Sequence, residues 1–403
     1  MLIAEWSRAE YRALAAAALG TRSKRDVDVL ARALSPMFAG KPLHLVGQGR
    51  LAITIALRLA AERAPGRSEV IVPAYICPSV LDAVERAGLR SVPADVGADF
   101  NIDAAEVGQS LTPRTLAVVA AHMYACPAAI ADIERICLAA GVHLIDDAAQ
   151  VLGVAAADRP LGCFGHFGIA SFSEVKSLTA GATNAGGALI VNDASFEAAA
   201  RRAVEALPAG SYRASDFIAF LEDGPLHRTA AALRYRIESL TGRKRSPRIC
   251  PPARMSNAAA AVALRQLDSF PARRTGRIRV AQAYERFLAG SGLALPQFAP
   301  GRYLTRVMVL LPEGTALSPL RAALRRQGLQ TRAGYALGER NRKALRRVPD
   351  LDRRLIELPN RSTLAEDEIA WICSTLLHAL GNDAPLASGP PRPHSGRLEA
   401  EGG

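Results

Sequence analysis

The sequence has few aromatic residues, few lysines and no paired cysteines. Aromatic residues make up 5% of the 403-residue chain, and none alternates with the basic clusters as a base-stacking surface for nucleic acid would require. The six cysteines are widely spaced and form no C-x-x-C pair, and the single C-x-x-H, Cys163 with His166, is followed by no second ligand pair. This spacing argues against a zinc site and against a disulfide framework.

The net charge of +12 would suit a nucleic acid, an anionic membrane or an acidic small molecule, or it reflects an arginine-rich genome. The basic residues are scattered along the chain, which favours the last two explanations, and we expect no nucleic-acid partner. No uncharged apolar run is long enough to span a membrane, and the N-terminus lacks a basic segment followed by an apolar one. We therefore expect a cytoplasmic protein with no membrane partner.

Apolar runs of strand length alternate with segments of helix length over the first half of the chain. The predicted strands are 70–72, 89–96, 116–121, 142–145, 167–170 and 188–191. The predicted helices are 51–57, 79–87, 130–140 and 196–207. This alternation with short connections is typical of an α/β fold with a mostly parallel sheet and helices on both faces. In such sheets, ligands bind at the carboxyl ends of the strands.

The second half of the chain predicts a smaller α/β unit. A small-residue helix at 255–267 ends near Pro271, and a long helix at 273–289 leads to the remaining elements. Those elements are a strand at 307–311, a helix at 317–327, a strand at 329–332 and a helix at 365–380. We expect four parts: an N-terminal helical segment (1–45), a large domain (46–270), a small C-terminal domain (271–380) and a disordered tail (381–403).

Lys176 is one of only five lysines in this arginine-rich chain, and it alone follows an apolar strand. The others, Lys24, Lys41, Lys244 and Lys343, lie beside arginines, prolines or glycines. A lysine held in an apolar pocket loses its proton more readily and can attack a carbonyl. A surface lysine whose aliphatic stem packs beside a loop would fit the same position. Its position alone does not decide between the two interpretations.

Two adjacent carboxylates, Asp146 and Asp147, follow the predicted strand 142–145. Side chains alternate faces along a strand, so only one of the two can face a given site. A magnesium site would usually need a phosphate-bearing partner site as well, so we expect no metal. His143 lies within this strand, and we expect it to be a core histidine. His122 directly follows the strand predicted at 116–121 and is a candidate site residue.

A G-x-G turn, Gly47-Gln48-Gly49, precedes the apolar helix predicted at 51–57. An apolar helix of this kind is buried. The backbone N–H groups in its first turn have no partners within the helix and suit an anion. Many such turns bind nothing, so the turn by itself does not identify a ligand.

Four separated stretches together resemble the DegT-type family of sugar aminotransferases, which are pyridoxal-phosphate enzymes of fold type I. The stretches are Val72-Pro73-Ala74-Tyr75, Ile145-Asp146-Asp147-Ala148-Ala149-Gln150, Ser171-Phe172 with Lys176, and Gly186-Gly187-Ala188. They occur in the family's order and at nearly its spacing, between about residues 43 and 380. The resemblance implies the fold type I architecture of a large and a small domain, and a homodimer with its sites at the subunit interface.

The resemblance also implies roles around the ring of the cofactor, pyridoxal 5′-phosphate. Lys176 matches the lysine that holds the cofactor as a Schiff base and later moves the proton, and a lowered pKa serves both roles. Asp147 matches the aspartate that pairs with the pyridinium nitrogen and so keeps the ring an electron sink. Gln150 matches the residue beside the ring hydroxyl.

Three further residues match the binding site of the cofactor phosphate. Ser171 matches a serine that donates to the phosphate, and Gly49 with Arg50 matches the helix N-terminus on the same group. Arg50 stands where the family usually has a small hydroxyl residue. Its side chain therefore either adds a charge to the site or turns away from it.

Other positions depart from the family pattern. Cys77 stands where the family usually stacks an aromatic ring on the cofactor, so Tyr75 or another residue must substitute. The asparagine that a partner subunit commonly sends to the phosphate is replaced within the segment 251–253. Ser173 and Glu174 replace the usual aromatic or histidine neighbours of the lysine. These changes leave the cofactor chemistry in place and affect the substrate.

The resemblance predicts transfer of an amino group from an amino acid, glutamate in the first place, to a nucleotide-linked keto-sugar. A pyridoxamine-dependent dehydratase is one alternative, although relatives with that chemistry carry histidine in place of the lysine. A non-catalytic cofactor-binding regulator or partner protein is another, suggested by the missing aromatic ring and asparagine.

Overall fold

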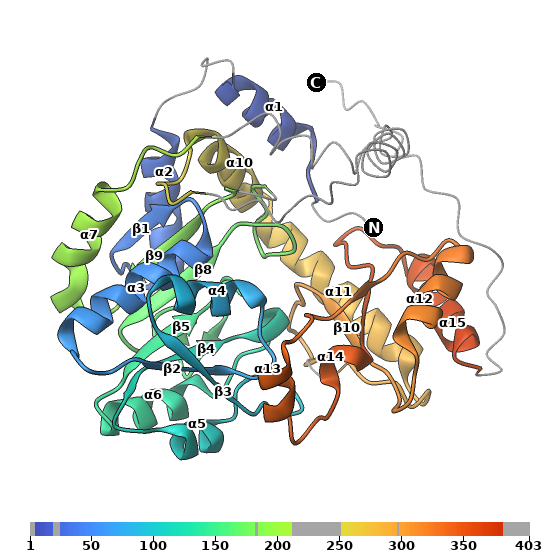
Figure 1. The fold of residues 1–403 in the computed structure, drawn as a ribbon. Helices are drawn as coiled ribbons and strands as arrows, with labels where there is room; N and C mark the ends of the chain where they lie inside the picture. The colour runs from blue at the N-terminus through green and yellow to red at the C-terminus, as the bar shows by residue number, and fades with distance from the viewer. Residues whose placement is uncertain (1–4, 19–24, 182–183, 212–250, 296–297, 382–403) are drawn as a thin grey trace, which may run out of the picture.

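The computed structural model describes residues 5–18, 25–181, 184–211, 251–295 and 298–381. A seven-stranded sheet with the order β1-β9-β8-β5-β4-β2-β3 lies at the centre of the first half of the chain (Figure 1). Its strands are β1 (Leu43–Val46), β2 (Glu69–Pro73), β3 (Arg90–Ala94), β4 (Thr115–Ala121), β5 (His143–Asp147), β8 (Phe167–Ser171) and β9 (Gly187–Val191). The strands from β8 to β3 are parallel, and β9 is antiparallel to both of its neighbours. The prediction of a mostly parallel sheet is confirmed.

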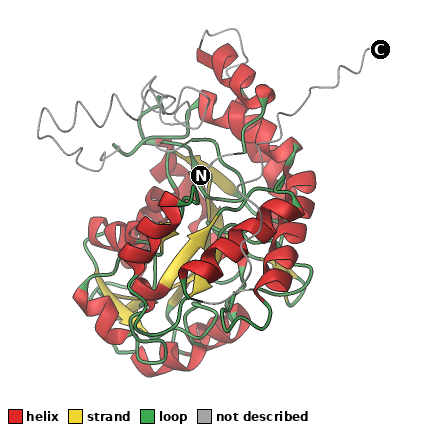
Figure 2. Ribbon diagram, turned by 90° about the vertical axis from the view of Figure 1, so that its right-hand side faces the viewer, coloured by secondary structure: helices red, strands yellow, loops and turns green. Residues whose placement is uncertain are grey.

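Helices cover both faces of this sheet, as Figure 2 shows. The first face packs on α2 (Asp26–Leu34), α5 (Ala104–Ser110), α6 (Ile130–Ala139) and α10 (Asn257–Asp268), and α1 (Arg8–Ala18) lies against α10. The second face packs on α3 (Gly49–Arg63), α4 (Pro78–Arg86) and α7 (Glu197–Glu205). Within β2, Ile71 belongs to the first hydrophobic cluster, and Val70 and Val72 belong to the second. This alternation buries both faces of the strand, which explains its continuous apolar sequence.

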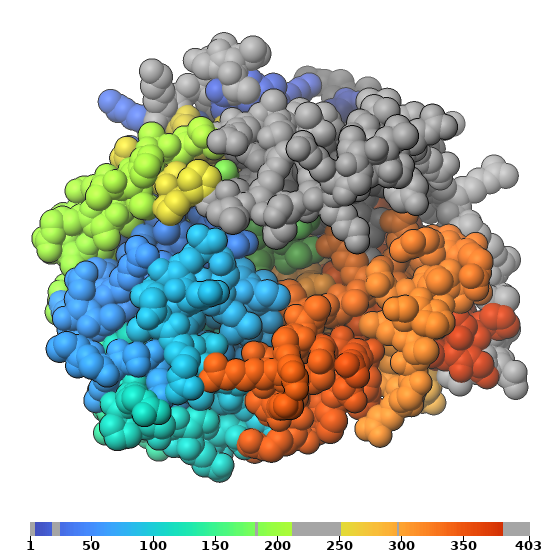
Figure 3. Space-filling view, in the orientation of Figure 1, coloured from blue at the N-terminus to red at the C-terminus, as the bar shows by residue number. Residues whose placement is uncertain are grey.

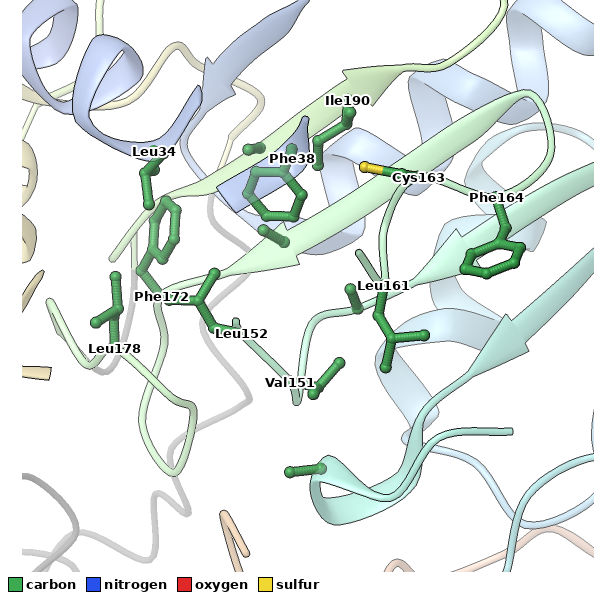
Figure 4. Packing of buried hydrophobic residues seen from close by; sticks show 14 of the residues in the cluster. Leu34, Phe38, Val151, Leu152, Leu161, Cys163, Phe164, Phe172, Leu178 and Ile190 are labelled. Carbon is green, nitrogen blue, oxygen red and sulfur yellow. The ribbon is translucent and has the colours of Figure 1, made fainter. Parts of the chain in front are cut away.

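The loop that carries Lys176 is anchored in the first cluster. Phe172 and Leu178 flank it in sequence, each is 1% exposed, and both point into the core (Figure 4). The backbone N–H of Ala180 donates to the carbonyl of Phe172 at 2.7 Å. The lysine is therefore held on a short loop whose two ends are fixed.

The C-terminal part forms a second sheet with the order β10-β12-β11. Its elements are α11 (Phe270–Leu288), β10 (Val307–Leu310), α12 (Leu317–Arg326), β11 (Arg332–Ala333), α13 (Glu339–Ala344), α14 (Leu351–Arg354), β12 (Leu355–Leu358) and α15 (Glu366–Ala379). A third hydrophobic cluster joins α11, α12 and α15 to this sheet. Helix α13 packs on β3, the edge strand of the large sheet, so the two parts are in contact (Figure 3). The domain boundary at 270/271 stays a prediction. In sequence it lies after the last strand of the seven-stranded sheet and before the first strand of the three-stranded sheet.

Short elements complete the fold. They are the two-stranded β6 (Ala155–Ala156) and β7 (Arg159–Pro160) and the 3-10 turns η1 (Ser35–Phe38), η2 (Met123–Ala125) and η3 (Ala194–Phe196). None of the helices described is long and apolar enough to cross a membrane.

Several elements differ from the sequence prediction. Strands β1 and β12 and helix α5 were not predicted, and the strand expected at 329–332 is only the two-residue β11. Pro271 lies in the first turn of α11 rather than in a break before it, because that turn needs no N–H from proline. The predicted tail, from residue 382 onward, lies outside the described residues.

Candidate active site

A cavity of about 470 Å³ lies where β5 and β8 end. Asp147 is the last residue of β5, Ser171 is the last residue of β8, and Lys176 lies on the loop that follows. All the predicted site residues line this one cavity: Gly49, Arg50, Asp147, Gln150, Ser171 and Lys176. Segments far apart in sequence meet here because the carboxyl ends of parallel strands share one edge of the sheet.

Lys176 is half-buried at the wall of the cavity. Burial lowers the pKa of its ammonium group below the usual lysine value, and the positive charge of Arg306 lowers it further, while Asp147 opposes both effects. The loss of hydration disfavours the charged form of a lysine. The side chain therefore gives up its proton more readily than a surface lysine does.

The two adjacent aspartates point to opposite sides of β5, as predicted. Asp147 faces the cavity, and burial raises the pKa of its carboxyl group although Lys176 lowers it. Asp146 is fully buried and accepts hydrogen bonds from His122 Nε2 at 2.6 Å and from the backbone N–H groups of Gly162 and Phe164 at 2.6 and 3.0 Å. The carboxylate of Asp146 thus holds the segment that contains Gly162 and Phe164, and Asp146 does not line the cavity.

His122 supports Asp147 from behind rather than lining the cavity. Its Nδ1 accepts from the backbone N–H of Ala128 at 3.0 Å, so its Nε2 carries the proton donated to Asp146. Its own backbone N–H donates to the carbonyl of Asp147 at 3.2 Å. The histidine is therefore a positioning residue within the fold.

His143 is half-buried and lies away from the cavity, among His166 and Phe196, with ring centroids at 4.7 and 5.8 Å. Burial lowers the pKa of its imidazole. Its Nδ1 lies 3.2 Å from the carbonyl of Leu116. Within the residues that the structure describes, no group of three or more histidine, cysteine, aspartate and glutamate side chains is arranged to hold a metal ion.

One corner of the cavity is formed by very close backbone approaches. A Cβ atom on Gly49 would lie 2.9 Å from Cβ of Ser171, and one on Gly187 would lie 2.5 Å from the backbone nitrogen of Gly49. The hydroxyls of Ser171 and Ser173 are 3.3 Å apart at the same corner. These contacts leave no room for a side chain, so they hold the N-terminus of α3 close to the two hydroxyls at this corner of the cavity, an arrangement that suits a small anion.

The side chain of Arg50 points away from this corner. The guanidinium binds Asp82 on α4 at 3.1 Å and is 44% exposed. The amide of Gln48 instead donates to Asn184 at 3.1 Å, and both of these residues line the cavity. Of the two alternatives stated for Arg50, the structure has the side chain turned away.

Gln150 also lines the cavity and is buried, 5% exposed. Its Oε1 accepts from the backbone N–H of Tyr124 at 3.3 Å, and its Nε2 lies 3.6 Å from the sulfur of Met123. A thioether is a weak acceptor. The amide nitrogen therefore retains most of its capacity to donate to a ligand.

Tyr75 does not replace the missing stacking ring. It is fully buried, its hydroxyl lies 2.6 Å from the hydroxyl of Tyr124, and it is absent from the lining of the cavity. Cys77 does line the cavity, with its sulfur 3.0 Å from the hydroxyl of Ser79. A ring ligand at this position would lie against a thiol and not against an aromatic face.

The sequence prediction missed the residues that the C-terminal part contributes, Arg306, Arg332 and Tyr335. Two signals could have found them. Arg306 directly precedes the apolar strand predicted at 307–311, as Lys176 follows one, and Tyr335 is an isolated ring in a chain poor in aromatic residues. The cavity is thus lined by residues of the large domain and by residues of the C-terminal part.

An α/β fold that brings a lysine of lowered pKa, a buried carboxylate and an anion corner to one cavity suits an enzyme that acts through a bound phosphorylated carbonyl compound. The sequence profile of the DegT/DnrJ/EryC1/StrS aminotransferase family matches residues 27–377. The chain belongs to this family, and the predicted fold type I architecture and aminotransferase class are confirmed.

Known proteins of this kind are similar to the chain over most or part of its length. It is 28% identical to the UDP-N-acetyl-3-dehydro-alpha-D-glucosamine 3-aminotransferase of Acidithiobacillus ferrooxidans, over 87% of this chain and 88% of that protein. It is 36% identical to a pleiotropic regulatory protein of Geobacillus stearothermophilus, over only 36% of this chain and 39% of that protein. The structure of DesI in the presence of its TDP-sugar product superposes with a TM-score of 0.69 at 26% identity, covering 92% and 90% of the two chains.

Proposed function

We propose that this chain is a pyridoxal-5′-phosphate-dependent aminotransferase that moves an amino group from an amino acid, glutamate in the first place, to a nucleotide-linked keto-sugar. The observation that carries the proposal is the common cavity of Lys176 and Asp147, at the ends of β8 and β5. Each of the two opposite charges favours the charged form of the other, so that the charge of Lys176 lowers the pKa of Asp147 and the charge of Asp147 raises that of Lys176. A reactive amine facing a buried carboxylate is the minimum that this chemistry needs.

The residues present fit the cofactor. The close packing of Gly49 against Ser171 and Gly187 brings backbone N–H groups and a hydroxyl together beside the cavity, where they can donate to a phosphate. The cavity of about 470 Å³ lies within the range of small-molecule sites. When bound, pyridoxal phosphate supplies a carbonyl group to react with amines and a ring that accepts electrons from the substrate carbon.

The chain's own residues then hold groups and move protons. Lys176, with its lowered pKa, can be neutral at its Nζ and take a proton from the substrate carbon or return it. The carboxylate of Asp147 would hold positive charge on the ring nitrogen, since no water competes for it there. Gln150 would donate from Nε2 to the ring hydroxyl, and the hydroxyl of Ser171 to the phosphate.

The nature of the substrates is supported by the relatives. The Acidithiobacillus protein is named for a UDP-linked keto-sugar, and DesI was solved with a TDP-sugar. In this chain Arg332 and Arg306 line the cavity from the C-terminal part and would favour acidic ligands. We further propose a homodimer, as the family resemblance implies, which light scattering after size-exclusion chromatography would test, and a cytoplasmic location, as the sequence predicts.

The proposal is tested by the visible absorption spectrum of the purified protein with added pyridoxal phosphate, before and after glutamate. We expect a visible band that bleaches with glutamate and is missing in Lys176→Ala. Circular dichroism of the variant shows whether its fold is retained. A band that forms normally in a folded Lys176→Ala protein would contradict the role of this lysine.

A regulator without catalytic activity is the second candidate, favoured by the partial similarity to a protein named as regulatory and by Cys77 at the wall where a ring would stack. The same spectra separate the two functions. A stable band that no amino acid bleaches would support the regulator, whereas bleaching by glutamate would exclude it.

A further inference from the structure

A second cavity, of about 660 Å³, lies apart from the one that contains Lys176. It is bounded by the segment 5–7 with α1, by the junction of α10 and α11, and by the segment 361–363 before α15. Helix α1 packs on α10, as Figure 1 shows. Among the described residues, the two cavities share no lining residue. A volume of this size is in the range of small-molecule sites, so the second cavity is a separate candidate site.

Three arginines line the second cavity, Arg265, Arg273 and Arg361. Arg273 is 8% exposed, and its Nη1 and Nη2 donate to the side-chain and backbone carbonyl oxygens of Gln266, which carry no charge. Arg265 forms an ion pair with Asp268 at 3.0 Å. The Nε atoms of Arg265 and Arg273 are buried, and the described part of the chain offers them no hydrogen-bond partner. The charge on Arg273 is thus incompletely compensated, which is costly for a buried cation.

Two further carboxylates of the cavity are committed to other donors. Glu10 accepts from Nε2 of Gln266 at 2.6 Å. Glu5 accepts from Nε of Arg277 at 3.3 Å, and although burial raises the pKa of Glu5, the charge of Arg277 and hydrogen bonds together lower it below its usual value. Burial, and then the charge of Arg277, lower the pKa of Arg273 to about 10, although Glu5 and Glu10 oppose them. Both shifts have the sign expected of an electropositive cavity, which an anion would complete.

Two aromatic rings line the same cavity. Trp6 and Tyr11 meet edge to face, with ring centroids 5.3 Å apart and an interplanar angle of 72°. Both side chains are half-buried. Tryptophan and tyrosine offer a ligand large flat contact area at a low cost in conformational entropy. Rings beside arginines suit a ligand that has both a flat ring and an anionic group.

The walls of the second cavity bond directly to the loop that carries Lys176. Nε1 of Trp6 donates to the backbone carbonyl of Thr179 at 2.7 Å, and the backbone N–H of Thr179 donates to Oε1 of Gln266 at 3.2 Å. This Oε1 is also the acceptor of the buried arginine on α11. Nη1 of Arg277 lies 3.5 Å from the backbone carbonyl of Lys176. A change in these walls is therefore transmitted to the backbone of the lysine loop.

We propose that the second cavity binds a small organic anion that carries a flat ring, and that this ligand acts on the loop of Lys176. The arginines hold the anionic group, and Trp6 with Tyr11 contacts the ring. A ligand that prefers one position of these walls also favours one position of the loop bonded to them. Nucleotides and aromatic carboxylates both have this chemistry. The inference adds a site to the proposed function and does not depend on the cofactor chemistry.

The fluorescence of Trp6 reports on this cavity. The chain has two tryptophans, and the other, Trp371, lies at the edge of the third hydrophobic cluster. The Trp371→Phe protein, with added pyridoxal phosphate, is titrated with uridine 5′-monophosphate and with benzoate. Uridine and benzamide lack the negative charge and are the matched control ligands. We expect a saturable change in Trp6 emission with an anion and none with its neutral counterpart at the same concentrations.

A double variant in the same protein, Arg265→Gln with Arg361→Gln, tests the arginines. Both side chains are partly exposed, at 41% and 32%, so the fold should be retained. We expect the anion to bind about three- to thirtyfold more weakly, as for two partly exposed charge contacts. Arg135→Gln is the matched control, because its ion pair with Asp132 on α6 has the same spacing as that of Arg265 and lies outside the cavity. This control should leave the affinity unchanged.

Each outcome decides the proposed site. A response to uridine 5′-monophosphate alone would identify the ligand as a nucleotide, and a response to benzoate alone would identify it as an aromatic acid. Equal responses to the anions and to their neutral counterparts, no response at all, or full anion affinity in the folded double variant would overturn the proposal. If the double variant does not fold, Arg361→Gln alone decides the site, with a smaller expected loss of about two- to fivefold.

The action on the loop is tested by reciprocity. An anion that changes the affinity for pyridoxal phosphate must have its own affinity changed by pyridoxal phosphate by the same factor. We expect a change of about twofold or more in both titrations, and its loss in the double variant. An unchanged affinity for the cofactor at saturating anion would overturn the action on the loop. If pyridoxal phosphate forms no visible band, the proposed function is overturned, whereas the Trp6 titration without cofactor still decides the second site.

Discussion

The close contacts at the anion corner between Gly49, Ser171 and Gly187 predict a measurable effect of the substitution Gly187→Ala. The new methyl group would lie 2.5 Å from the backbone nitrogen of Gly49 and 2.8 Å from the carbonyl oxygen of Ala170. Ordinary contact begins at 3.4 Å, so the start of α3 must retreat by about 0.9 Å from β8 and β9. Both obstacles are backbone atoms, so no flexible side chain can move aside. We expect a loss of about 1–3 kcal/mol in the free energy of unfolding, as for other overpacked sites.

The same displacement should weaken cofactor binding. A retreat of this size takes a hydrogen bond of ordinary length beyond about 3.5 Å, where it contributes little. The loss of one charge-assisted bond to phosphate is worth about 1.5–3 kcal/mol, which is roughly a ten- to 150-fold loss of affinity for pyridoxal phosphate. Urea titration of the cofactor-free protein measures the stability, and absorbance titration with pyridoxal phosphate measures the affinity.

Gly108→Ala is the matched control. Gly108 is exposed in α5, and a Cβ atom there would meet nothing within 4 Å. Alanine in an open helical position should raise stability by about 0.5–1 kcal/mol and leave cofactor affinity unchanged. If Gly187→Ala behaved like Gly108→Ala in both measurements, the close approach of α3 to β9 would be refuted.

Three further predictions concern the buried charges. Lys176→Ala should abolish turnover with an unchanged circular dichroism spectrum, and residual turnover above about one part in a hundred would contradict proton transfer by Lys176. Because the folded state lowers the pKa of this lysine, its protonated form destabilises the fold. In urea titrations without cofactor, Lys176→Met should therefore be the more stable protein at neutral pH, with the difference vanishing as the pH rises above the usual lysine pKa; a difference that grows with pH would have the wrong sign. Asp146→Asn should cost about 1–3 kcal/mol for each group it leaves unsatisfied, since its amide cannot accept from His122, Gly162 and Phe164 together, and an unchanged melting temperature would show that this network contributes little.

The elements that the sequence predicted well have a strong local pattern. Strand β4 is apolar throughout because both of its faces are buried, and α3 is apolar nearly all round for the same reason. The missed elements lack that pattern. Strand β1 includes His44, and β12 includes Glu357, whose partner Arg306 is distant in sequence. In the sequence alone, a charged residue that is buried beside a distant partner cannot be told from a charged residue on the surface.

The sequence by itself determined six of the seven strands of the large sheet, the position of Lys176 after a core strand, and the fact that only one of the two aspartates could face the site. These follow from period-two alternation and strand ends, which are local properties of the chain. Only the tertiary structure brought Arg306, from the second sheet, to the same cavity, and turned Arg50 toward Asp82. Contacts of this kind depend on how separate elements pack, and no local periodicity encodes the direction of a long charged side chain.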